Sequence, residues 1–562
     1  MIIPKGDAMD KAQILERLKT HLQQLKNTHK APRNEVSIEW VTQICNLIGI
    51  PKDYAPLCEQ ILSYKPLTRL VWLHMAECTG CSESFLRLDK PGVESLLLEY
   101  ISLEYHETIM GAVGFNAKQC LHDTLKEEFI LVIEGGVSLG ENAYFLTSGA
   151  DSTNGENECL EVARHAQAIF AIGTCSSFGG VQAAYPNPTQ SQGISTFLRQ
   201  PIVNIPGCPP SEANMIGSLM YYILLQEIPP CDSLNRPLWS YGKNLHEMCE
   251  RKAKFESGDF VESFDDERLQ DGYCLYKVGC KGPYVANNCP KVKFNAKTSW
   301  PVRAGHGCIA CSEPDFWDSF GKIEEPINNA NAYIKDKKPL KSLPLVHRLD
   351  DTLLDSTLCL ELDSLSDTRI YSQEKQNLNL LAVSFYANLS ALLPYLASKN
   401  KLGARLVENY HKWRLKEELE SVLDSESAED SISHNASDML KLVGMMFGKS
   451  LNHAQVLDLA QSYLFPHISK LDFKLTTKDN GGCEIEVNKS LRLPLCYLLG
   501  GLEIEGVAYS VVSSICEILA LALVELCKIY NISQVAFKGD LMQNPLIQDR
   551  LATYLPKWLK VV

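Results

Sequence analysis

Short apolar runs in the middle of the chain each end in a loop rich in glycine, cysteine or proline. Four such runs are present, at 67–75, 127–140, 166–180 and 201–210. Helix-like stretches separate them, such as 156–167 before the third run. Short apolar runs that alternate with helical stretches are typical of a parallel sheet with helices on both faces. The loops after such strands gather at one edge of the sheet, where ligand sites form. The sequence therefore predicts an α/β fold with a doubly wound parallel sheet.

The segments around this pattern predict further domains. Residues 1–66 have apolar residues at helical spacing, which predicts an amphipathic helical extension in front of the sheet domain, 67–215. Residues 216–330 have little regular pattern and are dense in cysteine, glycine and proline, so we expect bound metal to stabilise them. A linker at 330–345 then leads to a C-terminal domain, 346–562.

Two stretches of the C-terminal domain stand out by composition. Residues 423–437 are acidic and rich in serine, which is typical of a mobile loop. The longest apolar run, 515–526, is interrupted by Glu517 and Glu525. Since a transmembrane helix needs about 20 apolar residues, we expect a buried helix here.

The composition narrows the class of protein. The 562 residues carry a formal net charge of −14 without a clustered basic face, so nucleic acid and anionic membranes are not expected partners. The N-terminus shows no apolar core and no arginine pair of an export signal, which predicts a cytoplasmic protein, or one held at the inner membrane through a partner. Twenty cysteines in such a protein favour metal sites over disulfides.

The cysteines on the loops after the predicted strands form a first candidate metal site. Cys78 and Cys81 make a C-x-x-C pair, and Cys175 and Cys208 follow later strands. The pair by itself fits half of a zinc site, a redox dithiol or half of an iron–sulfur site. Four thiolates that converge from strand ends suit a 4Fe-4S cluster, because each iron takes one thiolate.

Two further sets lie in 216–330. One combines an imidazole with three thiols, a set that also fits a structural zinc ion: His246, Cys249, Cys274 and Cys280. The other has three thiols and fits a 3Fe-4S cluster: Cys289, Cys308 and Cys311.

The motifs around these residues together resemble one known family. In order over residues 67–325 they are ECTGCSESFLR, EGGVSLGENAYF, AIGTCSSFGG, IPGCPP, GYCLYKVGCKGP, NNCPKVKFN and SWPVRAGHGCIACSEPDFWD. This segment is similar to the small, electron-transferring subunit of nickel–iron hydrogenases. The resemblance implies a flavodoxin-like doubly wound sheet followed by an irregular iron–sulfur domain.

The resemblance also implies cofactors, partners and ligands. Electrons from H₂ would leave the nickel–iron centre of a separate large subunit and pass along three clusters to an acceptor protein or a membrane cytochrome subunit. This chain would hold no catalytic residue and would be active only with its large subunit. The proximal 4Fe-4S cluster would be bound by Cys78, Cys81, Cys175 and Cys208, the medial 3Fe-4S cluster by Cys289, Cys308 and Cys311, and the distal 4Fe-4S cluster by His246, Cys249, Cys274 and Cys280.

Three residues near the proximal set refine this expectation. Oxygen-tolerant members of the family have additional cysteines at the positions of Gly80 and Gly180, so the resemblance implies oxygen sensitivity here. Glu134 stands where the family has a carboxylate near the proximal cluster. A carboxylate that caps a helix N-terminus or closes a turn would give the same pattern.

The C-terminal domain has a resemblance of its own. Residues 506–555 are similar to the end of the carbamoyltransferase maturation factor that helps to make the cyanide ligands of the nickel–iron centre. The resemblance implies an α/β domain of the acetokinase/Hsp70-like type. Asp540 replaces a glycine of the nucleotide-binding turn, where a carboxylate would repel phosphate. We therefore expect a degenerate domain that has lost catalysis and serves as a docking platform.

Other functions remain open from the sequence. A hydrogenase-derived assembly or maturation scaffold would explain the two resemblances in one chain, but it would not need three complete ligand sets. An H₂-sensing subunit would share the same motifs. A zinc-ribbon interaction module would explain the HxxC and CxxC pieces but not the first cysteine set.

Overall fold

The computed structural model describes residues 10–29, 31–33, 35–328, 339–346, 357–372, 379–417, 432–465 and 467–562. They form two compact units. The first unit contains the chain up to Glu250 together with Tyr284–Phe320, and the second contains Arg251–Pro283 together with Gly321–Val562. The predicted iron–sulfur segment 216–330 is thus divided between the two units. Most of the predicted linker 330–345 and of the acidic stretch 423–437 lies outside the described residues.

The first unit is built on a five-stranded sheet in which all neighbouring strands are parallel. Its order is β2-β1-β3-β7-β9, with β1 Thr68–His74, β2 Ile101–His106, β3 Ile130–Glu134, β7 Ala168–Ile172 and β9 Ile202–Ile205. The four apolar runs became β1, β3, β7 and β9, whereas the edge strand β2 was not predicted. The prediction of an α/β fold with a parallel sheet is confirmed. The order reverses between β1 and β3, and a crevice forms at the carboxyl ends of strands at such a point.

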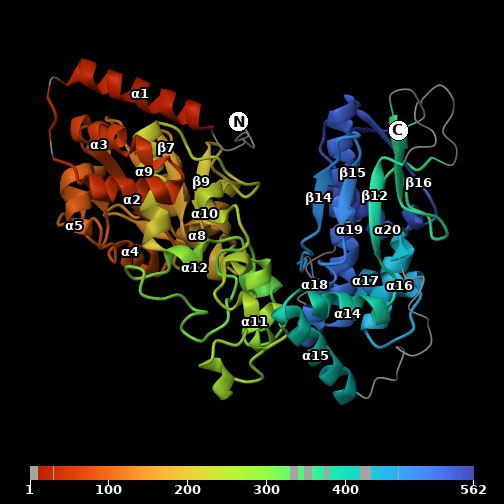
Figure 1. Ribbon diagram of the computed structural model, residues 1–562. Helices are drawn as coiled ribbons and strands as arrows, with labels where there is room; N and C mark the ends of the chain where they lie inside the picture. The colour runs from red at the N-terminus through yellow and green to blue at the C-terminus, as the bar shows by residue number, and fades with distance from the viewer. Residues whose placement is uncertain are drawn as a thin grey trace. The chain divides into compact units, whose positions relative to one another are not determined.

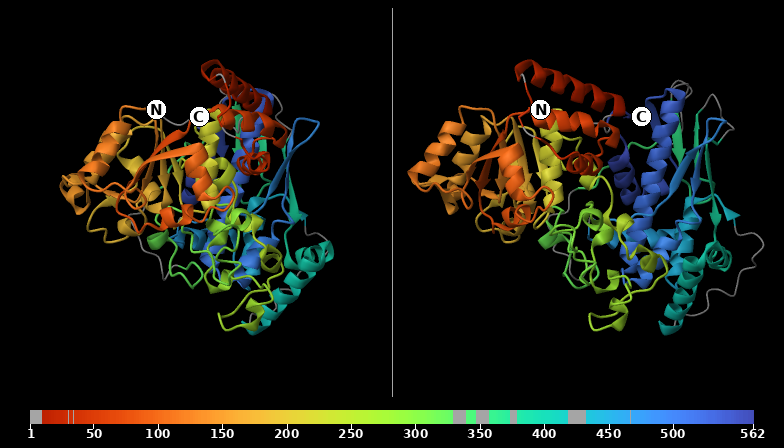
Figure 2. Two further views of the ribbon diagram at one scale, coloured as in Figure 1. Left: turned by 90° about the vertical axis from the view of Figure 1, so that its left-hand side faces the viewer. Right: turned by 60° about the vertical axis from the view of Figure 1, so that its left-hand side comes forward.

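Each face of this sheet has its own hydrophobic core, because successive side chains of a strand point to opposite sides. Trp72, Val132 and Phe170 belong to one core, and their neighbours Val71 and Leu131 belong to the other. Helices α1 (Lys11–Thr28), α2 (Ile38–Ile48), α3 (Ala55–Tyr64) and α9 (Glu212–Leu225) cover the first face. Helices α6 (Phe115–Thr124) and α7 (Gly155–Ala163) cover the second face. Figure 1 labels the helices of the first face, and Figure 2 shows the sheet between the two helical layers.

The helices predicted for the N-terminal extension are α1, α2 and α3. Helix α1 begins with a capping box, in which the Asp10 carboxylate accepts the Gln13 N–H at 2.8 Å and the Gln13 side chain accepts the Asp10 N–H at 3.0 Å. Leu18 and Trp40 of α1 and α2 are buried in the core shared with α9. The extension is therefore part of the sheet domain's core within the described residues.

The part of the first unit that follows α9 has few regular elements. They are short: α10 (Leu238–Tyr241), η6 (Leu245–Met248), α12 (Cys289–Val292) and α13 (Phe316–Ser319). The buried guanidinium of Arg236 pairs with Asp232 at 2.8 Å and with Glu313 at 2.9 Å. Glu313 also accepts the backbone N–H of Ala286 at 2.9 Å. These contacts hold irregular segments together where sheet or helix hydrogen bonds are few.

The second unit contains two four-stranded sheets. One has the order β11-β10-β16-β17, with β10 Thr357–Glu361, β11 Arg369–Ser372, β16 Gln534–Lys538 and β17 Lys560–Val561. The other has the order β13-β12-β15-β14, with β12 Leu381–Tyr386, β13 Ile432–Ser433, β14 Lys474–Thr477 and β15 Cys483–Glu486. The helices in the described residues after β12 are α14 (Leu389–Lys399), α15 (Lys401–Lys416), α16 (Ala436–Met446), α17 (His453–Ser462), α18 (Arg492–Leu499), α19 (Ile504–Tyr530) and α20 (Pro545–Tyr554).

Helix α19 contains the predicted apolar run 515–526 but is much longer, at 27 residues. The helix is long and apolar enough to cross a membrane, so the reason given for the prediction, a short apolar run, was wrong. The predicted burial itself is confirmed, because 83% of the most apolar 18-residue window is buried inside the protein. It packs against α17 and α20 and contacts strands of both sheets, as Figure 1 shows for the long blue helix.

Candidate metal centre

Four of the predicted thiols surround one cavity at the carboxyl edge of the first sheet. Cys78, Cys81, Cys175 and Cys208 line this cavity, which has a volume of about 80 Å³. Cys78 follows β1, Cys81 lies in α4 (Gly80–Phe85), Cys175 lies in α8 (Gly173–Phe178) after β7, and Cys208 follows β9. The carboxylate of Glu134, the last residue of β3, also lines the cavity. Loops after three different strands therefore bring the four thiols together.

Two glycines allow the backbone to lie against the sulfur atoms. At Gly173 φ is +85°, and a Cβ would lie 2.5 Å from Sγ of Cys81. At Gly180 φ is +59°, and a Cβ would lie 2.6 Å from Sγ of Cys175. Positive φ favours glycine, and both distances are too short for a side chain. Gly80 is less crowded, since its Cβ would lie 3.1 Å from Sγ of Cys78.

The surroundings disfavour the thiolate form of three of these thiols when no cation is bound. Desolvation, followed by repulsion from Cys208, raises the pKa of Cys175 to about 11. Desolvation, followed by repulsion from Cys311 and Cys78, raises the pKa of Cys208 to about 11 as well. Burial, and next to it the charge of Glu134, raises the pKa of Cys81 well above its ordinary value. Because iron binds thiolates, the positive charge of bound iron has to offset this repulsion.

The four thiols stand around one cavity, an arrangement that fits a core of several metal atoms. A 4Fe-4S cluster needs this pattern, with one thiolate for each iron at the corner of a larger core.

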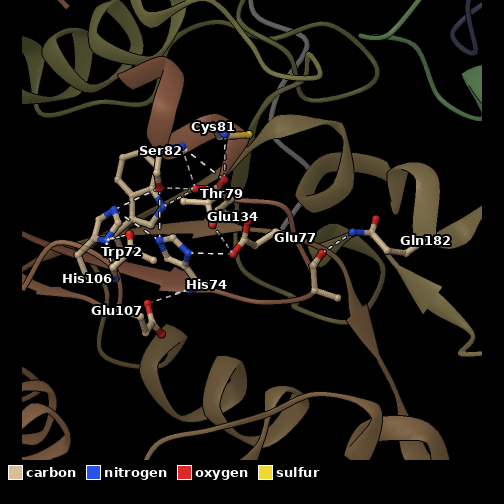
Figure 3. Close-up of polar contacts among 12 residues, drawn as sticks. Trp72, His74, Glu77, Thr79, Cys81, Ser82, His106, Glu107, Glu134 and Gln182 are labelled. Atoms are coloured by element: carbon tan, nitrogen blue, oxygen red, sulfur yellow. Dashed lines mark hydrogen bonds and ion pairs between the residues drawn. The ribbon is translucent and has the colours of Figure 1, made fainter. Parts of the chain in front are cut away.

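Glu134 fixes the segment that carries Cys81. Its carboxylate is 1% exposed and accepts the backbone N–H of Cys81 at 2.9 Å and that of Ser82 at 3.1 Å. It also accepts the Ser82 hydroxyl at 2.6 Å and the indole N–H of Trp72 at 3.1 Å. Figure 3 shows these donors around the carboxylate. Glu134 therefore binds the start of a helix and lines the cavity, whereas its place beside a cluster remains a prediction.

Two histidines extend this network (Figure 3). His74 Nδ1 lies 3.1 Å from the Glu77 carboxylate, and His74 Nε2 lies 3.4 Å from His106 Nε2. The Ser82 hydroxyl lies 3.3 Å from His74 Nε2 and 3.2 Å from His106 Nε2. Burial, followed by repulsion from His74, lowers the pKa of His106 to about 3. His106 is therefore a neutral packing partner of the loop that contains Cys78 and Cys81.

The second group of thiols in the first unit contains the predicted medial ligands. Cys289 begins α12, and Cys308 and Cys311 lie on one loop; Cys289 and Cys308 are both buried. Burial, followed by repulsion from Cys311, raises the pKa of Cys289. Burial also raises the pKa of Cys311, although a hydrogen bond from the backbone of Cys208 opposes this shift. Cys311 thus lies beside Cys208, which is a predicted ligand of the proximal cluster.

The predicted distal ligands belong to different units. His246 lies in η6 and Cys249 directly follows it, both in the first unit. Cys274 and Cys280 lie in the second unit. The structure describes the two halves of this set separately, so the complete four-ligand site remains a prediction.

The remaining cysteines behave as structural thiols with one exception. All twenty cysteines are among the described residues, and none of them forms a disulfide there. Nine of the ten cysteines outside the ligand sets are buried, or nearly so, whereas Cys120 is exposed.

Comparison with known proteins decides the family. Residues 78–222 match the family described as NADH ubiquinone oxidoreductase, 20 Kd subunit, and residues 241–324 match the C-terminal family of the NiFe/NiFeSe hydrogenase small subunit. The chain is 50% identical over 295 residues to the quinone-reactive Ni/Fe-hydrogenase small chain of Wolinella succinogenes, which covers 52% of this chain and 83% of that protein. The chain belongs to the small-subunit family of nickel–iron hydrogenases.

A second relative agrees with this assignment. The small subunit 1 of the periplasmic NiFe hydrogenase of Nitratidesulfovibrio vulgaris is 43% identical over 286 residues, which covers 50% of this chain and 89% of that protein. The solved structure of the reduced, active NiFeSe hydrogenase of Desulfomicrobium baculatum aligns with 30% identity and a TM-score of 0.44, over 47% of this chain and 100% of that chain.

Membership in this family confirms the function predicted from the cysteine motifs. A nickel–iron hydrogenase small subunit is the electron-transferring part of an oxidoreductase that acts on H₂ together with a catalytic large subunit, and its cofactors are iron–sulfur clusters. These relatives cover about half of this chain. The resemblance of 506–555 to a maturation factor remains a prediction.

Sequence reasoning did not identify most residues that hold the ligand loops in place. Ser82, Trp72 and Thr174 each donate a hydrogen bond at or near the cavity. Ser82 and Thr174 are neighbours of predicted ligands, which was the available signal. Trp72 has no such signal, because it is an apolar residue of a buried strand.

Proposed function

We propose that Cys78, Cys81, Cys175 and Cys208 bind a 4Fe-4S cluster that accepts electrons from the large subunit. The observation that carries this proposal is the single cavity lined by these four thiols at the carboxyl edge of the parallel sheet. The bound cluster would supply one-electron redox chemistry. Glu134 would hold the segment with Cys81 in place, and Gly173 would leave room for the backbone beside the cluster.

Two further clusters would complete the relay. Cys289, Cys308 and Cys311 would bind a 3Fe-4S cluster, and His246, Cys249, Cys274 and Cys280 would bind a distal 4Fe-4S cluster. The position of Cys311 beside Cys208 supports a medial cluster close to the proximal one. Electrons would leave from the distal cluster to an acceptor protein or to a membrane cytochrome subunit.

The test is an anaerobic purification of the complex with its large subunit. Two 4Fe-4S clusters and one 3Fe-4S cluster correspond to about eleven irons on this chain. We expect Cys208→Ser and Cys274→Ser each to lose about four irons, and Cys289→Ser to lose about three together with the EPR signal of an oxidised 3Fe-4S cluster. Cys159→Ser, at a buried thiol outside the sets, is the matched control. Equal iron in all four variants would refute the assignment.

The finer description of the two folds is also proposed. The order β2-β1-β3-β7-β9 supports a flavodoxin-like sheet, since that fold has the equivalent order 2-1-3-4-5. The C-terminal domain would be a degenerate acetokinase/Hsp70-like domain without nucleotide chemistry. In support, the Asp540 carboxylate accepts the Ser364 N–H at 2.7 Å, and Asn544 caps α20 by accepting the Leu546 N–H at 3.0 Å. Calorimetric titration of the full chain with Mg-ATP tests this, and saturable binding would contradict it.

The assembly-scaffold alternative is not favoured by the family assignment, and an H₂-sensing role would use the same subunit type. Stoichiometric copurification with a mature large subunit and H₂-dependent dye reduction are expected for the enzyme. Transient association with a precursor large subunit would instead support the scaffold. The cytoplasmic location remains a prediction that cell fractionation would check.

A further inference from the structure

The segment Arg251–Pro283 carries the two proposed distal ligands Cys274 and Cys280, and it belongs to the same compact unit as the C-terminal domain. It has little regular structure of its own, with α11 (Lys252–Glu256), η7 (Glu267–Leu269) and η8 (Tyr276–Val278). Helix α11 contacts α15 and α18 of the C-terminal domain. This segment therefore packs against a domain that follows it in the chain.

The first point of support lies behind Cys274. Its backbone N–H donates to the carbonyl of Asp259 at 3.1 Å, and its own carbonyl accepts the N–H of Val261 at 3.0 Å. The Asp259 carboxylate in turn accepts hydrogen bonds from Arg405 at 3.2 Å and from Asn409 at 3.1 Å, both on α15. One residue thus links the backbone of a proposed ligand to the surface of α15.

Asn409 binds the segment at two positions, Ser257 and Asp259. Its amide also donates to the carbonyl of Ser257 at 2.9 Å, and the Ser257 hydroxyl donates to the Asp259 carboxylate at 2.8 Å. Asp259 is 9% exposed. Loss of the α15 donors would leave a buried charge with fewer partners, which is costly.

The second point of support lies behind Cys280. Its backbone N–H donates to the carbonyl of Leu275 at 3.1 Å, so it closes the turn that contains Tyr276. The Tyr276 ring lies 5.7 Å from that of Phe255 and 5.7 Å from that of Tyr497 on α18, between ring centres. Tyr276 also packs against Gly500, where a Cβ would lie 2.4 Å from its ring. The turn is therefore held in an aromatic site formed with α18.

Arg492 forms ion pairs at the surface where α18 contacts the segment Arg251–Pro283. Arg492, the first residue of α18, pairs with Glu256 at 3.1 Å and with Asp472 at 2.7 Å. Its side chain is only 14% exposed, so solvent screens these pairs less than at an open surface. Cys496, one turn further along α18, lies with its sulfur 3.8 Å from the Glu256 carbonyl.

We propose that the surface formed by α15 and α18 of the C-terminal domain binds the segment Arg251–Pro283 and positions Cys274 and Cys280 for the distal cluster. Arg405, Asn409, Arg492 and Tyr497 are the positioning residues. The physical reason is that a segment with few regular hydrogen bonds cannot hold two thiols in place against conformational entropy without external contacts. The C-terminal domain thus acts within the electron relay as an internal support. This inference rests on the proposed distal cluster.

The test uses the full chain in complex with its large subunit. The double variant Arg405→Met/Asn409→Leu removes both α15 donors to Asp259. We expect amide hydrogen exchange in 251–283 to become about tenfold faster or more, since hydrogen bonds to charged groups are lost. We also expect the loss of about four irons and of the distal cluster's EPR signal, with the 3Fe-4S signal retained. Lys441→Ala, which removes the exposed pair with Asp438 on α16, is the matched control and should change neither readout.

The outcomes separate this inference from the proposed function. Unchanged exchange in 251–283 in the double variant, with full iron, would overturn the inference. If the double variant does not fold, Asn409→Ser removes the amide donors more gently and is expected to accelerate exchange in the same segment; unchanged exchange there would also overturn it. If the unmodified complex itself contains about four irons fewer than expected, the distal cluster fails, and the exchange measurement still decides whether α15 and α18 hold the segment.

Discussion

The hydroxyl of Thr174 donates a hydrogen bond to the backbone carbonyl of Cys311, although 137 residues separate them in the chain. The same hydroxyl accepts the backbone N–H of Gly207 at 3.0 Å. Thr174 precedes Cys175, and Gly207 precedes Cys208, so one side chain joins two loops of the proposed proximal site to a proposed medial ligand. The relative position of the two proposed clusters is therefore set partly by a residue that binds neither.

Replacement of Thr174 tests this link. Thr174→Val keeps the shape of the side chain but leaves the Gly207 N–H and the Cys311 carbonyl without this partner, so we expect about 1–3 kcal/mol of destabilisation. Anaerobic thermal unfolding of the complex measures it, and the EPR signal of the 3Fe-4S cluster should change as well. Thr174→Ser retains the hydroxyl and should behave like the unmodified protein; equal stability of all three proteins would contradict the role of the hydroxyl.

Replacement of the Glu134 carboxylate by an amide should destabilise the loop that contains Cys81. In Glu134→Gln one oxygen can still accept the Cys81 N–H, but an amide NH₂ group would face donors such as the Trp72 indole. We expect a loss of about 1–3 kcal/mol and a lower iron content, measured on the anaerobic complex. Glu127→Gln, at an exposed carboxylate, is the control. Full iron and unchanged unfolding in Glu134→Gln would refute this prediction.

A methyl group at Gly173 should exclude the proximal cluster. In Gly173→Ala the new Cβ would lie 2.5 Å from Sγ of Cys81, so the loop or the thiol must move. We expect the loss of about four irons, counted by metal analysis. Gly140→Ala is a matched control, because Gly140 also has positive φ, +60°, but a Cβ there would meet no atom within 4 Å. Equal iron loss in both variants would mean that backbone strain, and not the clash, is responsible.

The complex is expected to lose H₂-oxidation current in air, because Gly80 and Gly180 stand in place of the additional cysteines. Film electrochemistry under H₂ with a pulse of oxygen measures this, and a sustained current would contradict it. Gly180→Cys should not restore tolerance. Its Cβ would lie 2.6 Å from Sγ and 2.8 Å from Cα of Cys175, so the first effect should be loss of proximal iron.

Cys120 should be the non-ligand thiol that reacts with iodoacetamide in the native, iron-loaded complex. It is exposed, whereas the nine other cysteines outside the ligand sets are buried, and reactivity requires access to solvent. Peptide mass spectrometry after anaerobic labelling identifies the modified position. Labelling after denaturation is the control and should modify all ten; native labelling of Cys159 or Cys516 would contradict the buried positions.

The strands predicted from the sequence are those whose apolar character is local. Ile130–Glu134 and Ala168–Ile172 are short apolar runs that end at glycine, so they could be recognised without knowledge of their neighbours. Strand β2, Ile101–His106, contains Ser102, Glu104 and His106 and directly follows helical residues, so its pattern does not distinguish strand from helix. Its place at the sheet edge beside β1 decided its conformation.

At the candidate site, too, some features could be predicted from the sequence and others could not. Cysteine type, C-x-x-C spacing and glycine-rich loops are local properties of the chain, and they were enough to predict the ligand candidates, the family and the function. Other contacts at the site join residues that lie far apart in the chain. They are the hydrogen bonds to Glu134, the contact of Thr174 with Cys311, and the contacts through which α15 supports Cys274. Such contacts depend on which segments pack side by side, and packing follows from the burial of the whole core. Hence local chemistry in the sequence determined which atoms are candidate ligands of iron, while the tertiary structure alone decided what holds those atoms in position.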